Sequence, residues 1–210
     1  MTRETNLSEL TDRLLMLPVD RRSIVAIIGA PGSGKSTLAD ALVRGVNNAN
    51  PNCAALLPMD GYHFDDILLT SLGQQARKGA PDTFDVDGLH HMLARLREND
   101  ADSVAIPVFD RTIEIARAGA ALIQKTSNII VVEGNYLLLE LYPWKGLAPL
   151  FDVTVMIKTS PQTLRDRLML RWKNMGIDPT EARRKVEKND LPNGDFVMKN
   201  SRGTDFMIKT

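Results

Sequence analysis

The sequence contains a single cysteine, Cys53, and no long apolar stretch. One thiol excludes an intramolecular disulfide and a zinc site built from several cysteines. No apolar run approaches the about 18 residues that a membrane-spanning helix needs. The first twelve residues are too polar and too acidic for a signal or transit peptide. We therefore expect a cytoplasmic protein that does not insert into membranes.

The sequence also lacks net charge. Lysine and arginine together number 26, as do aspartate and glutamate. This balance argues against a protein that binds nucleic acid or an anionic membrane surface. A length of 210 residues, with 43% hydrophobic and 25% charged residues, is typical of one globular domain. Because internal repeats and low-complexity linkers are absent as well, we predict a single domain over residues 1–210.

Short apolar runs alternate with helical patterns along the chain. The run at 24–28 is continuous, which is typical of a central strand of a parallel sheet, buried on both faces. Other apolar runs that we interpret as strands lie at 54–57, 104–106, 129–132, 153–157 and 206–208. Helical patterns lie at 7–17, 35–46, 86–97, 161–175 and 179–188, the first of them ending at Pro18. The alternation predicts a three-layer α/β fold with a mostly parallel central sheet.

A glycine-rich sequence follows the first buried strand. It fits the pattern G-x-x-x-x-G-K-[ST] at every fixed position and continues with a threonine: Gly29, Ala30, Pro31, Gly32, Ser33, Gly34, Lys35, Ser36 and Thr37. Glycines let successive backbone N–H groups point at phosphate oxygens, and the helix that follows adds the positive end of its dipole. In this pattern Lys35 reaches the β- and γ-phosphates and the Ser36 hydroxyl binds Mg²⁺. The sequence therefore predicts a nucleotide site.

A phosphate loop alone does not distinguish a kinase from a GTPase or an ATP-driven machine. The Asn-Lys-x-Asp sequence with which GTPases bind guanine is absent, and Glu-Lys-Asn-Asp at 187–190 has the wrong order. Asp-Val-Asp-Gly at 85–88 matches Asp-x-x-Gly, but it follows no strand, and we expect it to begin a helix. Large ATP motors usually carry more mass or a basic track. These observations favour a small kinase.

Two carboxylates, Asp60 and Glu133, follow apolar runs. In a parallel sheet such positions lie at the carboxyl edge, beside the phosphate loop. Phosphoryl transfer to an alcohol needs one carboxylate near the nucleophilic hydroxyl and an acid near Mg²⁺. Asp60 precedes a glycine and could equally be a turn or capping residue. Packing explains Glu133 poorly, because it follows four buried apolar residues.

Several further segments carry a resemblance to a known family. They read Met-Asp-Gly-Tyr-His at 59–63, Lys-Gly-Ala-Pro-Asp-Thr-Phe-Asp at 78–85, Pro-Val-Phe-Asp-Arg at 107–111 and Val-Glu-Gly-Asn-Tyr at 132–136. With the phosphate loop and a later arginine-bearing helix, they resemble the phosphoribulokinase, uridine kinase and type I pantothenate kinase group of P-loop kinases. The chain is most similar to small bacterial members described as nucleoside or fructose-transport-system kinases. The resemblance covers residues from about 24 to 208.

The resemblance implies a P-loop NTPase fold with a helical lid at about 160–190, and a kinase that uses ATP and Mg²⁺. In this family the aspartate that matches Asp60 is the proposed base for the acceptor hydroxyl. The acid that matches Glu133 lies by the metal or the substrate. Homodimers occur among the relatives. Of the small-molecule acceptors, we rank a sugar such as fructose or a nucleoside such as uridine above pantothenate, because the chain is shorter than typical pantothenate kinases.

Five residues near these motifs are candidates for binding the acceptor. Tyr62 and His63 follow Asp60 closely enough to line its pocket, although a histidine there could also be structural. Arg111 and Arg117 follow the strand end at 107–109 and resemble the family's acceptor-side segment, where such cations can hold a hydroxyl-rich or anionic substrate; they could also lie solvated on the surface. Asp85 could bind the acceptor or cap the helix that follows it.

The helix predicted from residue 161 carries Arg165, Arg167 and Arg171. Arg167 and Arg171 are four residues apart and share a face, so both guanidiniums could reach the triphosphate. Arginines in such a lid neutralise the charge that develops during transfer and help to exclude water. We expect a C-terminal loop near the adenine, where the resemblance places it, formed by Asn193, Gly194, Asn200 and Arg202.

Two alternatives to a kinase of small hydroxyl compounds remain open. A regulatory protein could bind ATP without catalysis and control a partner, in which case replacing Asp60 would leave its function largely intact. A nucleoside monophosphate kinase would instead take an anionic acceptor and be saturated by a monophosphate.

Overall fold

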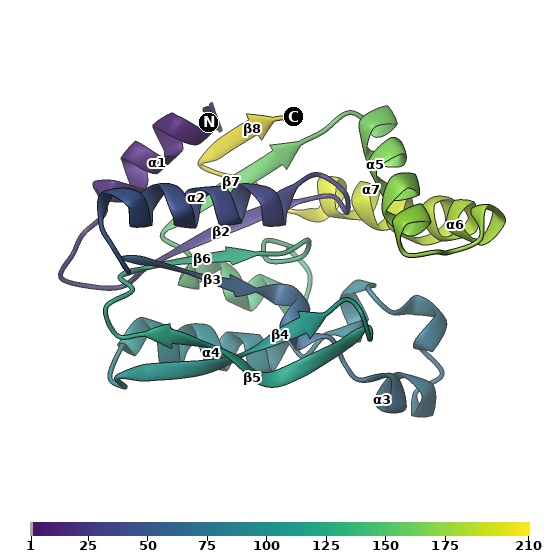
Figure 1. Cartoon of the computed structure of the whole chain (residues 1–210), viewed down its shortest axis with the longest axis horizontal. Helices are drawn as coiled ribbons and strands as arrows, with labels where there is room; N and C mark the ends of the chain where they lie inside the picture. The colour runs from purple at the N-terminus through teal and green to yellow at the C-terminus, as the bar shows by residue number, and fades with distance from the viewer. Residues whose placement is uncertain (1) are drawn as a thin grey trace.

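The computed structural model describes residues 2–210 and contains a six-stranded sheet in which every neighbouring pair is parallel (Figure 1). The strand order is β1-β8-β7-β2-β6-β3. The strands span Arg3–Glu4 (β1), Ser23–Gly29 (β2), Ala54–Pro58 (β3), Ile129–Glu133 (β6), Val153–Lys158 (β7) and Phe206–Lys209 (β8). The predicted α/β fold with a mostly parallel sheet is confirmed.

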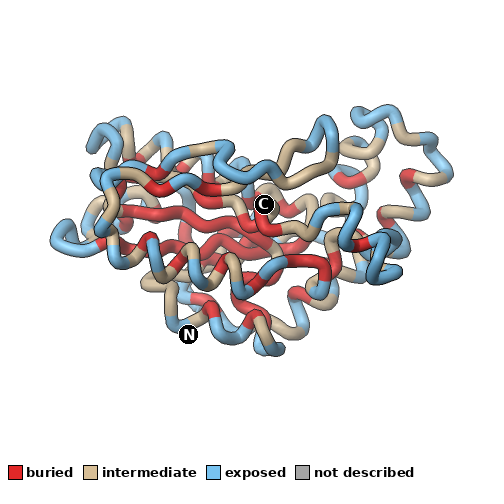
Figure 2. The backbone as a smooth tube through the Cα atoms, turned by 90° about the horizontal axis from the view of Figure 1, so that it is seen from below, coloured by how far each residue is buried: buried red, intermediate tan, exposed pale blue. Residues whose placement is uncertain are grey.

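The two central strands are buried on both faces, because β2 and β6 consist of buried residues throughout. Side chains alternate along β2 between two cores. Ile24, Ala26 and Ile28 belong to the core that contains α4 (Val86–Glu98), whereas Val25 and Ile27 belong to the core formed with α1 (Leu7–Leu15) and α2 (Lys35–Ala49). Figure 2 shows the buried strands between the more exposed helical layers.

Asp152, just before β7, ties the central strand to its surroundings. Its carboxylate accepts hydrogen bonds from the Ile24 amide at 2.8 Å, from Arg97 at 2.8 Å and from Arg21 at 2.9 Å. Burial alone would raise the pKa of Asp152, but these hydrogen bonds outweigh it and lower the pKa below its usual value.

The apolar run at 104–106 is a strand, as predicted, but it lies outside the main parallel sheet. It belongs to β4 (Ser103–Asp110), which pairs antiparallel with β5 (Ile115–Gln124) in a separate hairpin. Sequence analysis did not predict β5. Its alanines and glycine carry a weak strand preference, and antiparallel pairing with β4 provides the hydrogen bonds that hold it extended.

The lid follows β7 and consists of α5 (Pro161–Asn174), α6 (Pro179–Lys185), a π-helical turn (Val186–Asp190) and α7 (Leu191–Asn200). The loop expected around residues 193–200 is wrong, because this segment is helical. Asn-Gly is a common turn signal, but Gly194 is needed here for close packing. A Cβ atom at Gly194 would lie 3.0 Å from the Cβ atom of Ala30 in the phosphate loop.

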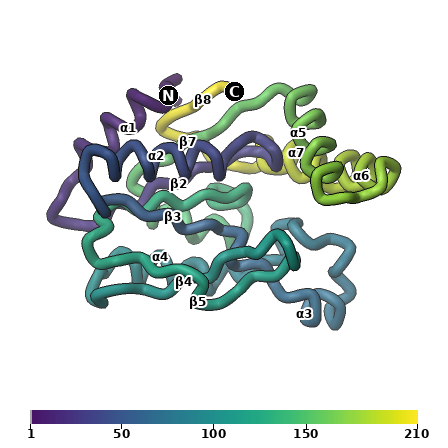
Figure 3. The backbone as a smooth tube through the Cα atoms, viewed as in Figure 1, coloured from purple at the N-terminus to yellow at the C-terminus, as the bar shows by residue number. Residues whose placement is uncertain are grey.

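Short helical segments complete the fold between β3 and α4. They are η1 (Met59–Tyr62), α3 (Asp66–Ser71), η2 (Gln75–Arg77) and η3 (Pro81–Thr83), and η4 (Trp144–Leu150) follows β6. The segment around α3 and the lid helices project from the same end of the molecule, while β1 and β8 bring both chain ends together (Figure 3). None of the helices between residues 2 and 210 combines the length and apolar character that a membrane crossing requires.

Candidate active site

The phosphate loop connects the end of β2 to the first turn of α2. Gly32 and Gly34 have φ angles of 78° and 95°, which only glycine adopts without strain. No side chain caps the start of α2, so its first N–H groups face the loop unpaired by a cap. The Lys35 ammonium donates to the Ala30 carbonyl at 3.0 Å across the loop. A loop of this form at a helix N-terminus is suited to bind phosphate.

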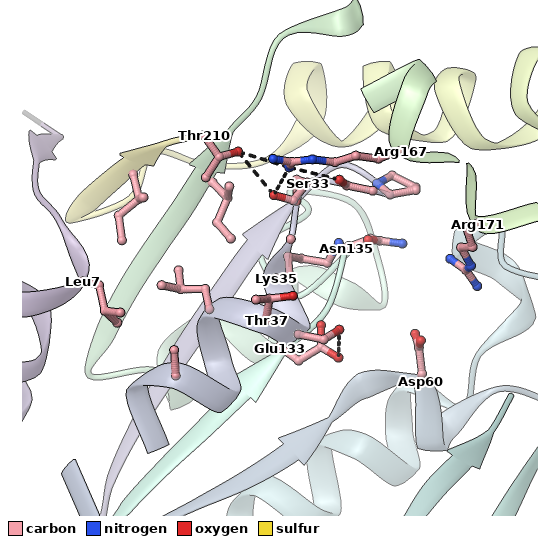
Figure 4. Close-up of a pocket in the computed structure, with 18 of the residues that line it drawn as sticks. Leu7, Ser33, Lys35, Thr37, Asp60, Glu133, Asn135, Arg167, Arg171 and Thr210 are labelled. Atoms are coloured by element: carbon pink, nitrogen blue, oxygen red, sulfur yellow. Dashed lines mark hydrogen bonds between the residues drawn. The ribbon is translucent and has the colours of Figure 1, made fainter. Parts of the chain in front are cut away.

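Glu133 lies beside this loop because β6 is the parallel neighbour of β2, with Glu133 in register with Ile27. The Ser36 hydroxyl donates to Glu133 Oε1 at 3.2 Å. Burial raises the pKa of Glu133 and lowers the pKa of Lys35, while each group's charge stabilises the charge of the other. The convergence of Ser36 and Glu133 that the sequence suggested is thus present in the structure. Figure 4 shows Glu133 together with Lys35 and Thr37 of the phosphate loop.

The donor chemistry of Ser36 and Glu133 fits Mg²⁺, which prefers hard oxygen ligands. Within residues 2–210 no group of three or more histidine, cysteine, aspartate or glutamate side chains could hold a metal. Mg²⁺ does not need such a cage, because it usually binds one or two carboxylates together with substrate phosphates and water.

A cavity of about 770 Å³ lies over the phosphate loop. A second cavity, of about 520 Å³, is lined by the lid, by the segment 75–80 and by the β4–β5 hairpin. We call these the loop cavity and the lid cavity. Five residues line both: Pro31, Asp60, Arg111, Asn135 and Arg171. A group held in one cavity is therefore adjacent to a group held in the other.

Asp60 occupies this junction because η1 directly follows β3. Its Oδ2 accepts a hydrogen bond from Arg111 Nη2 at 2.8 Å, and Arg111 comes from the hairpin tip. The Asp60 and Arg171 side chains point toward the same space from opposite sides (Figure 4). A carboxylate and a guanidinium thus face each other across the junction, where a hydroxyl group and a phosphoryl group could meet.

The three arginines of α5 have different surroundings. Arg167 Nη1 donates to the Ser33 carbonyl at 3.2 Å, so this side chain braces the phosphate loop from outside. Arg171 has no ion-pair partner within residues 2–210; burial, followed by the charge of Arg111, lowers its pKa. Arg165 pairs with Glu187 at 2.7 Å and lines neither cavity. Of these three arginines, only Arg171 therefore lines both cavities.

Three of the predicted acceptor-binding residues line neither cavity, and this part of the prediction needs correction. Asp85 accepts from the Gly88 amide at 2.8 Å and caps α4. Arg117 pairs with Asp110 at 3.3 Å on the exposed hairpin. Tyr62, at the end of η1, is buried in the core that contains α4, and burial raises its pKa. In each case a local partner or core packing determines the position of the side chain.

His63 does line the lid cavity, as the sequence suggested. Its Nδ1 lies 2.8 Å from the Asp60 carbonyl, and its ring packs against Phe84 and Phe109. Burial lowers the pKa of His63, which favours the neutral imidazole. The ring therefore forms part of an aromatic wall.

Sequence reasoning missed several residues of the lid cavity, among them Lys78, Asn135, Trp172, Lys185 and Lys188. Asn135 could have been found, because it stands two residues after Glu133 at the same strand end. Lys185 and Lys188 could not have been found, because the sequence gives no sign of the π-helical turn that lies at this point of the lid.

Comparison with known proteins identifies relatives of the whole chain, although no family model matches it. A Schizosaccharomyces pombe protein named "Putative uridine kinase" is 31% identical over 202 residues, covering 92% of this chain and 86% of the relative. A structure described as a "putative fructose transport system kinase" from Silicibacter sp. TM1040 has a TM-score of 0.88 and 34% identity, covering 97% and 98% of the two chains. A Myxococcus xanthus pantothenate kinase is 28% identical over 157 residues, which is 71% of this chain and 47% of that enzyme.

Proposed function

Because the chain belongs to the family of P-loop kinases that includes these uridine kinase-like and pantothenate kinase-like proteins, we propose that it transfers the γ-phosphoryl group of ATP to a hydroxyl group of a small metabolite. The observation that carries this proposal is the junction of the two cavities at Asp60 and Arg171. A kinase needs one site for the triphosphate, one for the acceptor, and catalytic groups between them.

The loop cavity is the proposed ATP site. The backbone N–H groups of residues 29–37 would hold the phosphates, with Lys35 at the transferred group. Arg171 would approach the same group from the lid and balance its negative charge, while Arg167 keeps the loop in place. Ser36 and Glu133 would hold Mg²⁺, which would neutralise part of the negative charge of the phosphates.

The lid cavity is the proposed acceptor site. Asp60 would orient the acceptor hydroxyl and accept its proton as the oxygen bonds to the γ-phosphorus. The bond from phosphorus to the β-phosphate bridging oxygen breaks in the same transfer, and ADP leaves with that electron pair. Arg111, hydrogen-bonded to Asp60, keeps the carboxylate aimed into the junction. The relatives' names span a nucleoside, a sugar transport system and pantothenate, so they support the reaction rather than one acceptor.

The test is ADP release with Mg-ATP against sugars, nucleosides, nucleoside monophosphates and pantothenate. We expect one acceptor to raise turnover well above the ATPase background, and Lys35→Ala and Asp60→Asn to lower the stimulated rate by at least about 10²-fold. Saturation by a nucleoside monophosphate would identify the alternative monophosphate kinase. Tight ATP binding without any stimulation would overturn the kinase proposal in favour of a regulatory ATP-binding protein.

A further inference from the structure

The lid cavity has an excess of positive charge that the whole chain does not have. Lysine and arginine side chains that line it outnumber aspartate and glutamate by seven to four, whereas the chain contains 26 of each class. Most of these cations are already paired: Arg77 with Asp82, Lys78 with Asp66, Arg111 with Asp60, and Arg184 with Glu181. The lining residues outside these pairs are three cations, described next, and two carboxylates, Glu114 and Asp190.

Three cations of this cavity have no ion-pair partner in the part of the chain that the structure describes: Arg171, Lys185 and Lys188. All three belong to the lid. Trp172 holds two of them together, because the Arg171 guanidinium lies 5.5 Å and the Lys185 ammonium 4.8 Å from its ring. The indole N–H in turn donates to Asp190 Oδ2 at 2.8 Å, which fixes the ring. Cations that lie this close together repel one another, and an anion bound between them would offset the repulsion.

The π-helical turn at Val186–Asp190 aligns these groups. Arg184 and Lys185 precede the turn, Lys188 and Asn189 belong to it and Asn193 follows it, and all five line the lid cavity. An insertion of this kind costs regular helical hydrogen bonding and is frequent at functional sites.

Lys185 and Lys188 face the acceptor side rather than the triphosphate side. They line the lid cavity but not the loop cavity, whereas Arg167 lines only the loop cavity and Arg171 lines both. The hairpin side of the lid cavity presents a carboxylate, in contrast to the cations of the lid side. There the Glu114 Oε1 atom is buried without a hydrogen-bond donor within residues 2–210. A ligand hydroxyl could donate to this carboxylate.

We propose that the acceptor is a hydroxylated anion whose carboxylate or phosphate group is bound by Lys185 and Lys188. This inference rests on the proposed kinase function and names the substrate class of the same site. It reverses the order expected from the sequence, which placed a neutral sugar or nucleoside first. An anion at the lid wall would leave the rest of the molecule against His63, Phe84 and Phe109 and direct a hydroxyl toward Asp60.

The experiment compares acceptors in matched pairs that differ in the anionic group: gluconate with glucose, glycerate with glycerol, pantothenate with pantothenyl alcohol, and fructose 6-phosphate with fructose. Turnover is followed as ADP release, and binding by calorimetry in the presence of Mg-ADP. We expect the preferred acceptor to be the anionic member of its pair. Its kcat/KM should exceed that of the neutral member by at least about tenfold, because one charge-assisted hydrogen bond strengthens binding by that factor. The carboxylate and phosphate pairs distinguish the two sources of charge.

The variants Lys185→Gln and Lys188→Gln should each raise the KM for that acceptor by about tenfold while leaving the KM for ATP within about twofold. Arg183→Gln is the matched control, because Arg183 is exposed on α6 and lines neither cavity. A neutral preferred acceptor, or a change confined to the KM for ATP, would overturn the inference and leave the kinase proposal standing. Anion binding weakened by the lysine variants, without turnover of any acceptor, would support the anion site and overturn the kinase proposal. If no compound binds or reacts, both fail.

Discussion

Replacing Gly61 by alanine tests how the hairpin is positioned against the candidate base. Gly61 follows Asp60 in η1, and β4 packs against it at Pro107. A Cβ atom at Gly61 would lie 2.5 Å from the Pro107 carbonyl oxygen and 2.8 Å from its carbonyl carbon. Both are backbone atoms, so no side-chain rotation relieves the overlap. The hairpin has to move away from η1, and Arg111 moves with it.

The size of the effect follows from the cost of forcing a methyl group into a filled space, about 1–3 kcal/mol. For a chain of this length, each kcal/mol lowers the melting temperature by about 2–4 °C. Gly61→Ala should therefore lower the Tm by about 2–12 °C. It should also lower the acceptor-stimulated rate, because displacement of Arg111 weakens the 2.8 Å hydrogen bond that orients Asp60.

Thermal unfolding followed by circular dichroism measures the first effect, with Gly146→Ala as the matched control. A Cβ atom at Gly146 meets no atom within 4 Å. This control should keep the Tm or raise it by about 1–4 °C, because alanine reduces the entropy of the unfolded chain. A Gly61→Ala protein that melts within about 1 °C of the wild type would refute the reasoning.

Three further predictions concern the site, the core and the pH dependence. Asp60→Asn should lower kcat by about 10²- to 10⁴-fold with the KM for ATP unchanged, whereas Asp65→Asn, which keeps the cap of α3, should have no effect on steady-state ADP release. Trp144→Phe should lower the free energy of unfolding by about 1–3 kcal/mol in urea titrations, because Trp144 is buried and the part-buried Pro81 carbonyl loses its 3.0 Å hydrogen bond; an unchanged midpoint would contradict this. Asp152 has a folded-state pKa below its unfolded value of about 3.9, so its ionised form stabilises the fold above about pH 4 and the contribution is lost as the pH falls through the folded pKa. The Tm difference between the wild type and Asp152→Asn should be present at pH 7 and narrow below about pH 4; a difference that is constant with pH would exclude this role.

The tertiary structure changed the sequence-based description at particular points. The run at 104–106 has the apolar character of a core strand, but hairpin pairing with β5 removes it from the parallel sheet. Asn193 and Gly194 have the composition of a turn, yet they lie in α7 because Gly194 allows the helix to pack on the phosphate loop. Asp85 and Arg117 were candidates for the acceptor, and each is instead held by a local partner. Composition cannot separate these cases, since the deciding contacts are with distant or competing groups.

The sequence by itself determined the phosphate loop, the parallel sheet around it and the approach of Glu133 to Ser36. These features follow from local rules: a fixed pattern of glycines, continuous apolar strands, and the meeting of parallel strands at one edge. Only the tertiary structure decided which side chains line the lid cavity. That cavity is built from the segment 75–80, from the tip of the β4–β5 hairpin, and from a π-helical turn that lies more than a hundred residues after the segment 75–80. Its charge depends on which lysines and arginines find a carboxylate within reach, and that is a property of the folded chain.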